Sequence, residues 1–400
     1  MTGPEVDPTG TATSPRGFTA GGAFAGIKTY GDGKLDVGIL ASDRLCNVAG
    51  VFTKNILHSA SVDVNRERLA DGKGQAVVVN SGVANSSTGD RGIEDGRAMT
   101  RLAAAKLNLK PADAFVCSTG VIGHFLPMDK VERGIADVAL TADGGEDFAR
   151  AIMTTDTRPK HAAVRFGPYT LGGCCKGSGM IHPNMATMLA FLTTDAPVDQ
   201  RYLQQQLREA ADRSFNLVSV DGDTSPSDTV LVFANGAAGG EEIGAGSRYA
   251  REFTEALAAL CIYLAKEIAR DGEGATKLIE ATVTGAASVE DARALVRLFT
   301  TSYLLKSAVH GADPNWGRIV SVVGRSAVRV NEPAVTVDLC GVRVYERTEP
   351  TEFDPLAVSD AMRGDLVTIA VDLGAGQATA TGWGCDLSAE YVSINADYHT

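Results

Sequence analysis

The chain holds 400 residues, which is enough for more than one hydrophobic core. Its 44% hydrophobic and 22% charged content is ordinary for a soluble globular protein, and its net charge of −12 argues against a nucleic-acid partner. No apolar run is long enough to span a bilayer, and residues 1–16 lack the apolar segment of a secretory signal. The chain has seven cysteines without paired spacing, which is typical of a protein in the reducing cytosol. We therefore expect a cytoplasmic protein without a membrane partner.

The N-terminal half mixes strand and helix patterns. Residues 1–15 are polar, and we expect them to be disordered. Alternating apolar residues predict a strand at 35–40, and 47–55 is typical of a strand followed by a turn. A β-branched strand is predicted at 76–80, and helical periodicity covers 93–109.

The C-terminal half shows the same mixture. Periodicity predicts helices at 202–214, 253–268, 289–306 and 354–362. Strands are predicted at 188–192, 278–284, 367–372 and 378–382, and a hairpin at 334–345 around Gly341. Together these elements predict a layered α+β core.

A glycine-punctuated stretch begins at Lys176 and ends in Ala186-Thr187, directly before the apolar run 188–192. We interpret it as a site where the chain cuts itself between Ala186 and Thr187. A threonine hydroxyl needs a nearby base, and a new N-terminal amine with a pKa of about 7.7–8.0 can serve as one. The residues alone leave a second interpretation open, namely a glycine loop before a buried strand.

A second block whose residues could take part in catalysis lies at 116–123, where a strand ends in Ser-Thr-Gly. Acyl transfer requires hydrogen-bond donors directed at a developing oxyanion. The Thr119 hydroxyl and the Gly120 N–H could supply two such donors, although an ordinary glycine turn would have the same sequence.

No signal for a bound cofactor is present, since the chain lacks Walker A, HExxH and CxxC motifs and its six histidines have no metal-binding spacing. Cys174-Cys175, expected in a loop before Lys176, are interpreted as structural thiols. Three aspartates at 221, 223 and 228 could suggest a divalent cation site, but a structural loop is the preferred interpretation.

Several of these blocks resemble the ornithine acetyltransferase family, also called glutamate N-acetyltransferase. The matching segments lie at 50–53 (GVFT), 80–85 (NSGVAN), 117–120 (CSTG), 153–156 (MTTD), 176–195 (the region of the expected cut), 221–229 (DGDTSPSDT), 313–318 (DPNWGR), 384–388 (GCDLS) and 391–400. Two departures stand out, because Val83 replaces the usual Asn and Pro226-Ser227 replace the usual Thr-Asn. The matches extend over about residues 17–400.

The resemblance implies a four-layer αββα sandwich that spans the cut, followed by a smaller C-terminal α+β domain. The expected boundaries are about 17–276 for the sandwich and about 277–400 for the smaller domain. Cleavage would yield an α fragment, 1–186, and a β fragment, 187–400, and two copies of each would form a heterotetramer.

The resemblance also implies an activity. Thr187 would take the acetyl group from N-acetylornithine and pass it to glutamate in arginine biosynthesis, by ping-pong chemistry without metal or organic cofactor. Thr119 and Gly120 would form the oxyanion hole. The substrate contacts implied by the family are Thr154 or Thr155, Lys176, Thr187, Glu273, Asn395 and Thr400.

Alternatives remain at this point. A related self-cleaving aminopeptidase or amidase would release the acyl group to water, and an uncleaved binding protein would have no activity. A paralogue from an antibiotic cluster would accept other acyl substrates. The sequence does not settle whether acetyl-CoA is also used.

Overall fold

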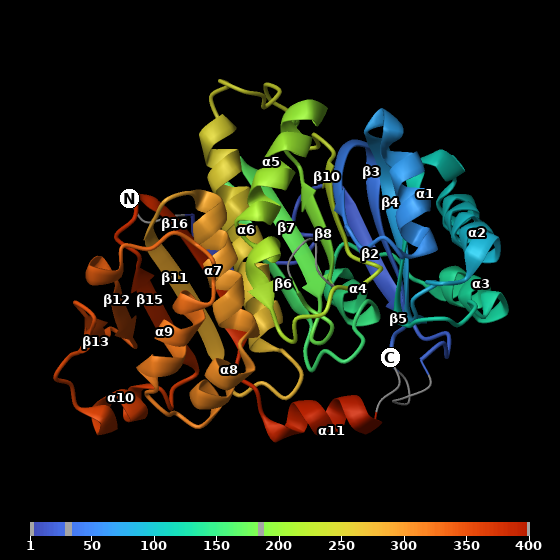
Figure 1. Ribbon diagram of the computed structural model, residues 1–400. Coiled ribbons are helices and arrows are strands. Elements are labelled where there is room, and N and C mark those ends of the chain that lie inside the picture. The colour runs from blue at the N-terminus through green and yellow to red at the C-terminus, as the bar shows by residue number, and fades with distance from the viewer. Residues whose placement is uncertain (1–3, 29–33, 183–187, 398–400) are drawn as a thin grey trace.

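Two β-sheets organise the computed structural model, which describes residues 4–28, 34–182 and 188–397 (Figure 1). The nine-stranded sheet contains β1 (Val6–Asp7), β2 (Phe18–Ala23), β3 (Val37–Phe52), β4 (Lys73–Val83), β5 (Ala114–Val121), β6 (Lys160–Phe166), β7 (Tyr169–Lys176), β8 (Leu189–Thr194) and β10 (Thr229–Ala234). The seven-stranded sheet contains β9 (Val218–Ser219), β11 (Leu278–Ala286), β12 (Thr336–Leu339), β13 (Val342–Glu346), β14 (Glu349–Pro350), β15 (Leu366–Asp372) and β16 (Ala378–Cys385).

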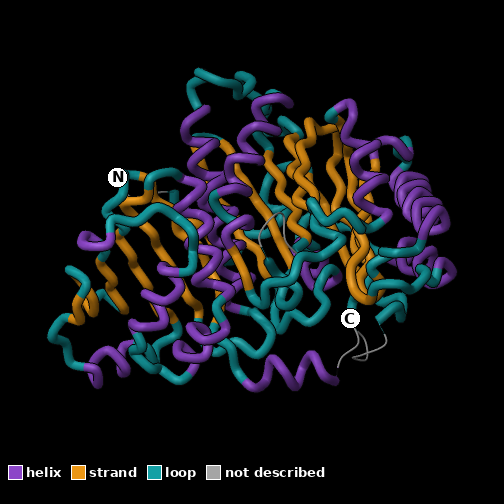
Figure 2. The backbone as a smooth tube through the Cα atoms, in the orientation of Figure 1, coloured by secondary structure: helices purple, strands orange, loops and turns teal. Residues whose placement is uncertain are grey.

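Helices pack against both sheets (Figure 2). They are α1 (Ala60–Arg68), α2 (Gly89–Leu107), α3 (Met128–Asp137), α4 (Gly145–Ala151), α5 (Gln200–Asp212), α6 (Ala250–Arg270), α7 (Val289–Thr301), α8 (Tyr303–His310), α9 (Trp316–Gly324), α10 (Pro355–Ala361) and α11 (Ala389–Asp397). Within the described ranges, none of these helices has the length and apolarity needed to cross a bilayer.

The long strand β3 folds the nine-stranded sheet into two layers. Its first part, 37–41, pairs with β4, and its last part, 47–52, pairs with β10. Between them the register with β4 shifts, and such an irregularity bends a strand. One layer therefore contains β2, β4 and β5, and the other contains β6, β7, β8 and β10.

Three apolar cores stabilise these layers: one lies between the two sheet layers, and one lies on the outer face of each. Between the sheets, the Phe115 ring of β5 meets the Phe233 ring of β10 edge to face at 5.8 Å. On one outer side, α5 and α6 cover the layer with β6–β8, and on the other, α1, α2 and α3 cover β4 and β5. This arrangement confirms the predicted αββα sandwich.

The seven-stranded sheet has a core of its own, into which α7 and α9 pack. Its edge strand β9 nevertheless comes from residues 218–219 and pairs in parallel with β16. A short segment of the sandwich part of the chain is therefore also the edge strand of the second sheet. A domain boundary near residue 277 stays a prediction.

Some local predictions were wrong. Residues 6–7 form β1 on β6 and Ala12 is fully buried, so the described part of 1–15 is ordered. The predicted strands at 35–40 and 47–55 are one strand, β3, because pairing with β4 and β10 continues along it. Residues 289–306 form two helices, separated at Ser302, whose ψ of 104° is not helical.

A buried ion network joins three segments that are distant in sequence. The Lys160 ammonium, at the start of β6, contacts Asp156 at 2.6 Å and also contacts Asp271, directly after α6. Asp156 accepts the backbone N–H groups of Thr154 and Gly177 as well. Burial alone would raise the pKa of Asp156, but the charges of Lys160 and Lys176 hold this pKa well below its usual value. The network therefore fixes the end of β7 against the loop at 154–157.

We predict that Phe115→Ala destabilises the sandwich by about 3–5 kcal/mol, because it leaves a cavity between the two sheets. The urea midpoint of unfolding, followed by circular dichroism, measures this effect. Ile56→Ala is the control, since Ile56 is 89% exposed and its removal should cost less than about 0.5 kcal/mol. Equal midpoints for the two variants would contradict the packing described.

Lys160→Met should cost about 3–5 kcal/mol, because two buried carboxylates lose their shared cation. Burial would then raise the pKa of the Asp156 carboxyl group, so the loss of stability relative to wild type should become smaller as the pH falls from about 8 to about 5. Thermal melting across this range tests the prediction. Arg97→Met, which breaks the exposed pair with Glu67, should cost at most about 1 kcal/mol at any of these pH values.

Candidate active site

A cavity of about 420 Å³ opens at the ends of β5 and β7, where the loops after α6 and before β10 meet α11. Among the residues predicted from sequence, it is lined by Gly120, Thr154, Thr155, Lys176, Glu273 and Asn395. Thr119 is buried in β5 beside it and is not part of the lining. Ala186, Thr187 and Thr400 lie outside the described residues.

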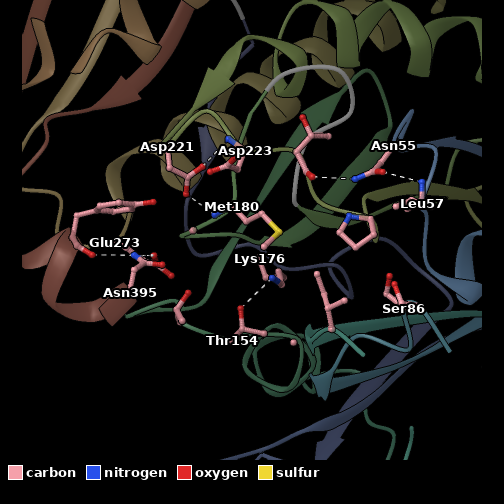
Figure 3. A pocket seen from close by; sticks show the side chains of 18 residues that line it. Asn55, Leu57, Ser86, Thr154, Lys176, Met180, Asp221, Asp223, Glu273 and Asn395 are labelled. Atoms are coloured by element: carbon pink, nitrogen blue, oxygen red, sulfur yellow. Dashed lines mark hydrogen bonds between the residues drawn. The ribbon is translucent and has the colours of Figure 1, made fainter. Parts of the chain in front are cut away.

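Lys176 occupies the centre of the cavity wall (Figure 3). It is the last residue of β7, where it pairs with Leu189 at the start of β8. The residue is 3% exposed, and its ammonium donates a hydrogen bond to Thr154 Oγ1 at 3.1 Å. Burial lowers the pKa of Lys176, although Asp156 and Asp228 oppose this effect. A buried cation of this kind is suited to bind a carboxylate.

Glu273 lies on a neighbouring wall and is oriented from both sides. Its backbone N–H donates to the Ser178 carbonyl at 3.0 Å, and its Oε2 accepts from Asn395 Nδ2 of α11 at 2.8 Å (Figure 3). Gly179 leaves room for the carboxylate, because a Cβ atom there would lie 2.3 Å from Oε1. The cavity thus presents a fixed acid on the wall next to the buried lysine.

Gly120 is required by its backbone. Its φ of +125° is favourable only for glycine, and a Cβ atom would lie 2.3 Å from the carbonyl carbon of Gly82 on the neighbouring strand β4. Directly after this contact, the register of β4 shifts at Val83, one of the positions that departs from the family pattern. Asn80 Nδ2 donates to the Val83 carbonyl at 2.9 Å, so the turn forms without the usual amide side chain.

Asp221 and Asp223 lie together on the side of the cavity away from Thr154 (Figure 3). The Asp221 carboxylate accepts the N–H groups of Met180 and Ile181 at 2.6 and 2.9 Å. Burial raises the pKa of Asp221 to about 6, despite these hydrogen bonds. The described residues contain no cluster of His, Cys, Asp and Glu that could hold a metal ion. The Asp221 carboxylate thus anchors the backbone at 180–181.

Sequence reasoning missed the residues that support the cavity from behind. Asp156 and Lys160 lay within a recognised block and Asp271 lay two residues before Glu273, but none of the three was singled out. Only the folded structure reveals them, because it buries these opposite charges next to one another. Cys174 and Cys175, expected in a loop, lie in β7, where pairing with β6 and β8 buries both free thiols.

Comparison with known proteins agrees with this geometry. A sequence model described as the ArgJ family matches residues 19–400. The "Arginine biosynthesis bifunctional protein ArgJ" of Symbiobacterium thermophilum is 52% identical over 98% of this chain and 99% of its own length. The protein of the same name from Deinococcus radiodurans is 48% identical over 99% of this chain and its full length.

A solved structure is similar as well. The crystal structure of arginine biosynthesis bifunctional protein ArgJ from Bacillus halodurans is 42% identical, with a TM-score of 0.50. It covers 52% of this chain and 97% of the solved chain. The family match over nearly the whole sequence and the relatives above 45% identity lead to one conclusion: the chain belongs to the ArgJ family.

Proposed function

We propose that this chain cuts itself between Ala186 and Thr187 and then transfers an acetyl group from N-acetylornithine to glutamate, as a step of arginine biosynthesis. The observation that carries the proposal is the cavity at the start of β8. There a buried cation, Lys176, and an oriented acid, Glu273, face the same space as the Gly120 backbone. Such a cavity suits an amino acid, which carries one carboxylate and one ammonium group.

The proposed cut uses the Thr187 hydroxyl on the carbonyl carbon of Ala186. The hydroxyl oxygen forms an ester while the peptide nitrogen of Thr187 takes a proton and leaves as an amine. Water then opens the ester, which leaves a carboxylate on Ala186 and a free hydroxyl on Thr187. The new α-amino group, with a pKa near neutrality, becomes the base for the next reaction.

The transfer follows the same chemistry with a different acyl group. The Thr187 hydroxyl attacks the acetyl carbonyl of N-acetylornithine, and its proton passes through the Thr187 amine to the departing ornithine. The Gly120 N–H and the Thr119 hydroxyl stabilise the tetrahedral oxyanion. Glutamate then attacks acetyl-Thr187 with its amine, which restores the free hydroxyl.

We assign the substrate contacts by charge. Lys176 binds the α-carboxylate, with Thr154 beside it, since Thr154 already accepts a hydrogen bond from this ammonium. Glu273, held by Asn395, binds an ammonium group. Thr155 and the terminal Thr400 complete the proposed set.

The length of the solved relative supports the cut. Alignment of 52% of 400 residues with 97% of that chain corresponds to a polypeptide of about 214 residues. The interval 187–400 contains the same number. A separate polypeptide of this length is what cleavage before Thr187 would produce.

The proposal extends to organisation. The two fragments remain associated, two copies of each form a heterotetramer in the cytoplasm, and the sandwich of about 17–276 is followed by the smaller domain of about 277–400. No cofactor takes part in the reaction. Because the relatives are named bifunctional proteins, acetyl-CoA is a second acetyl donor to test in the same assay.

We predict that purified wild type consists of fragments 1–186 and 187–400 and transfers acetyl from N-acetylornithine to glutamate. Thr187→Ala should remain one chain and be inactive, because neither the hydroxyl nor the terminal amine can form. Intact-mass measurement and an acetyl-transfer assay test both statements.

The same assay separates the rival functions. Release of acetate in place of acetylglutamate would identify a hydrolase, and an intact wild-type chain without activity would favour a binding protein. An active, uncut Thr187→Ala variant would refute the mechanism.

Ornithine binding should weaken as the pH falls through about 6, because protonation of Asp221 removes a negative charge from the cavity wall. A loss on the order of 1 kcal/mol, about fivefold in Kd, is expected between pH 7.5 and pH 5. Calorimetric titration measures it without the chemical step. Asp221→Asn should bind ornithine more weakly at pH 7.5 with a flatter pH profile, and an unchanged profile would assign the effect to another group.

A further inference from the structure

The start of β8 is held between two neighbouring strands. Leu189 pairs with Lys176 of the antiparallel strand β7 and with Thr229 of the parallel strand β10. Met188, the residue that follows Thr187 in sequence, is buried just before this row. Any side chain that contacts Met188 therefore acts one peptide group away from the proposed nucleophile.

Asp228 makes this contact. Its Oδ1 accepts the Met188 N–H at 2.9 Å, and the Thr229 N–H donates to the Met188 carbonyl at 3.1 Å. The Asp228 carbonyl in turn accepts the Thr53 N–H at 3.0 Å, which anchors it to the end of β3. Both backbone polar groups of Met188 are thus held by two consecutive residues.

The second carboxyl oxygen of Asp228 is not explained by this anchoring. The residue is 1% exposed, and its Oδ2 has no hydrogen-bond partner in the described part of the chain. A buried polar atom without a partner is destabilising, whereas a shorter hydroxyl side chain could accept the amide without leaving a second oxygen unpaired. An acid at this position is therefore a stability liability that a role in the site would account for.

Burial raises the pKa of Asp228 well above its usual value, and the charge of Lys176 only partly opposes the shift. Burial therefore favours the protonated, uncharged form of this side chain. In this form one oxygen accepts a hydrogen bond and the other can donate one, as the two ends of an asparagine amide do.

We propose that Asp228 is a positioning residue for the nucleophile. Its hydrogen bond fixes the Met188 N–H, in the peptide group that follows the proposed nucleophile in sequence. This inference rests on the proposed function. Misplacement of a reacting group by about 1 Å can reduce a rate about 100-fold, so one such contact can control both self-cleavage and transfer.

Three substitutions test the inference in the full chain. Asp228→Leu removes both polar atoms at similar volume, and Asp228→Glu moves the acid by one methylene group. Both should slow self-cleavage, and kcat of the cleaved fraction, by about tenfold to 100-fold, with KM within about twofold. Asp228→Asn keeps one acceptor and one donor, and should stay within about fivefold of wild type.

A matched control lies at the other end of the same strand. Asp195 directly follows β8, is 2% exposed and accepts the Thr170 N–H at 2.9 Å. Asp195→Leu and Asp195→Asn should leave the rate of self-cleavage within about twofold of wild type, even where they change the melting temperature.

The outcomes separate the two proposals. If wild type stays uncut, the proposed function fails and the inference fails with it. If wild type is cut and Asp228→Leu or Asp228→Glu is cut at the same rate, only the inference is overturned. A folded Asp228→Asn variant as slow as Asp228→Leu would also overturn it, because the site would then require an ionisable acid. Should Asp228→Leu not fold, the Glu and Asn variants still decide the question.

Discussion

The register of β8 is the constraint on which the site depends. Successive residues of this strand face two different cores: Leu189 and Phe191 pack between the sheets, whereas Ala190 and Leu192 pack under α5 and α6. A slip by one residue would exchange the two sets, so apolar packing on both faces fixes the register. That register aligns Lys176, Leu189 and Thr229 in one row at the end of the sheet. The first residue of β8 therefore lies beside Lys176 at the cavity wall.

Buried charge is the second constraint, and it carries a cost. Lys160 and Lys176 are both removed from water, which is unfavourable unless acids compensate them. Asp156 interacts with both lysines and at the same time accepts the N–H of Gly177, so orientation and charge compensation come from one side chain. A hydrophobic replacement of the network could be more stable. The network is better understood as the device that holds a cation at a defined place beside the cavity.

Sequence reasoning succeeded where a local pattern decides the structure. Periodicity identified most helices and strands, and the recognised blocks contained Gly120, Lys176, Glu273 and Asn395, which do meet in one cavity. It failed where tertiary contacts decide. The polar segment at 4–15 is ordered because β1 adds to the edge strand β6, and the break at Ser302 interrupts a run with helical periodicity. The role of Lys160 could not be found, because nothing local distinguishes a buried charge from a solvated one.

The cavity also explains why a cut chain can remain one protein. Gly120, Thr154 and Lys176 precede the proposed cut, whereas Glu273 and Asn395 follow it, so neither fragment contains the site alone. The pairing of β7 with β8 and of β3 with β10 crosses the cut, and the core between the sheets combines side chains from both sides of it. Separation would expose these cores and break both ladders. These shared cores and ladders would hold the two fragments together after the proposed cut, so the structure that forms the cavity would persist.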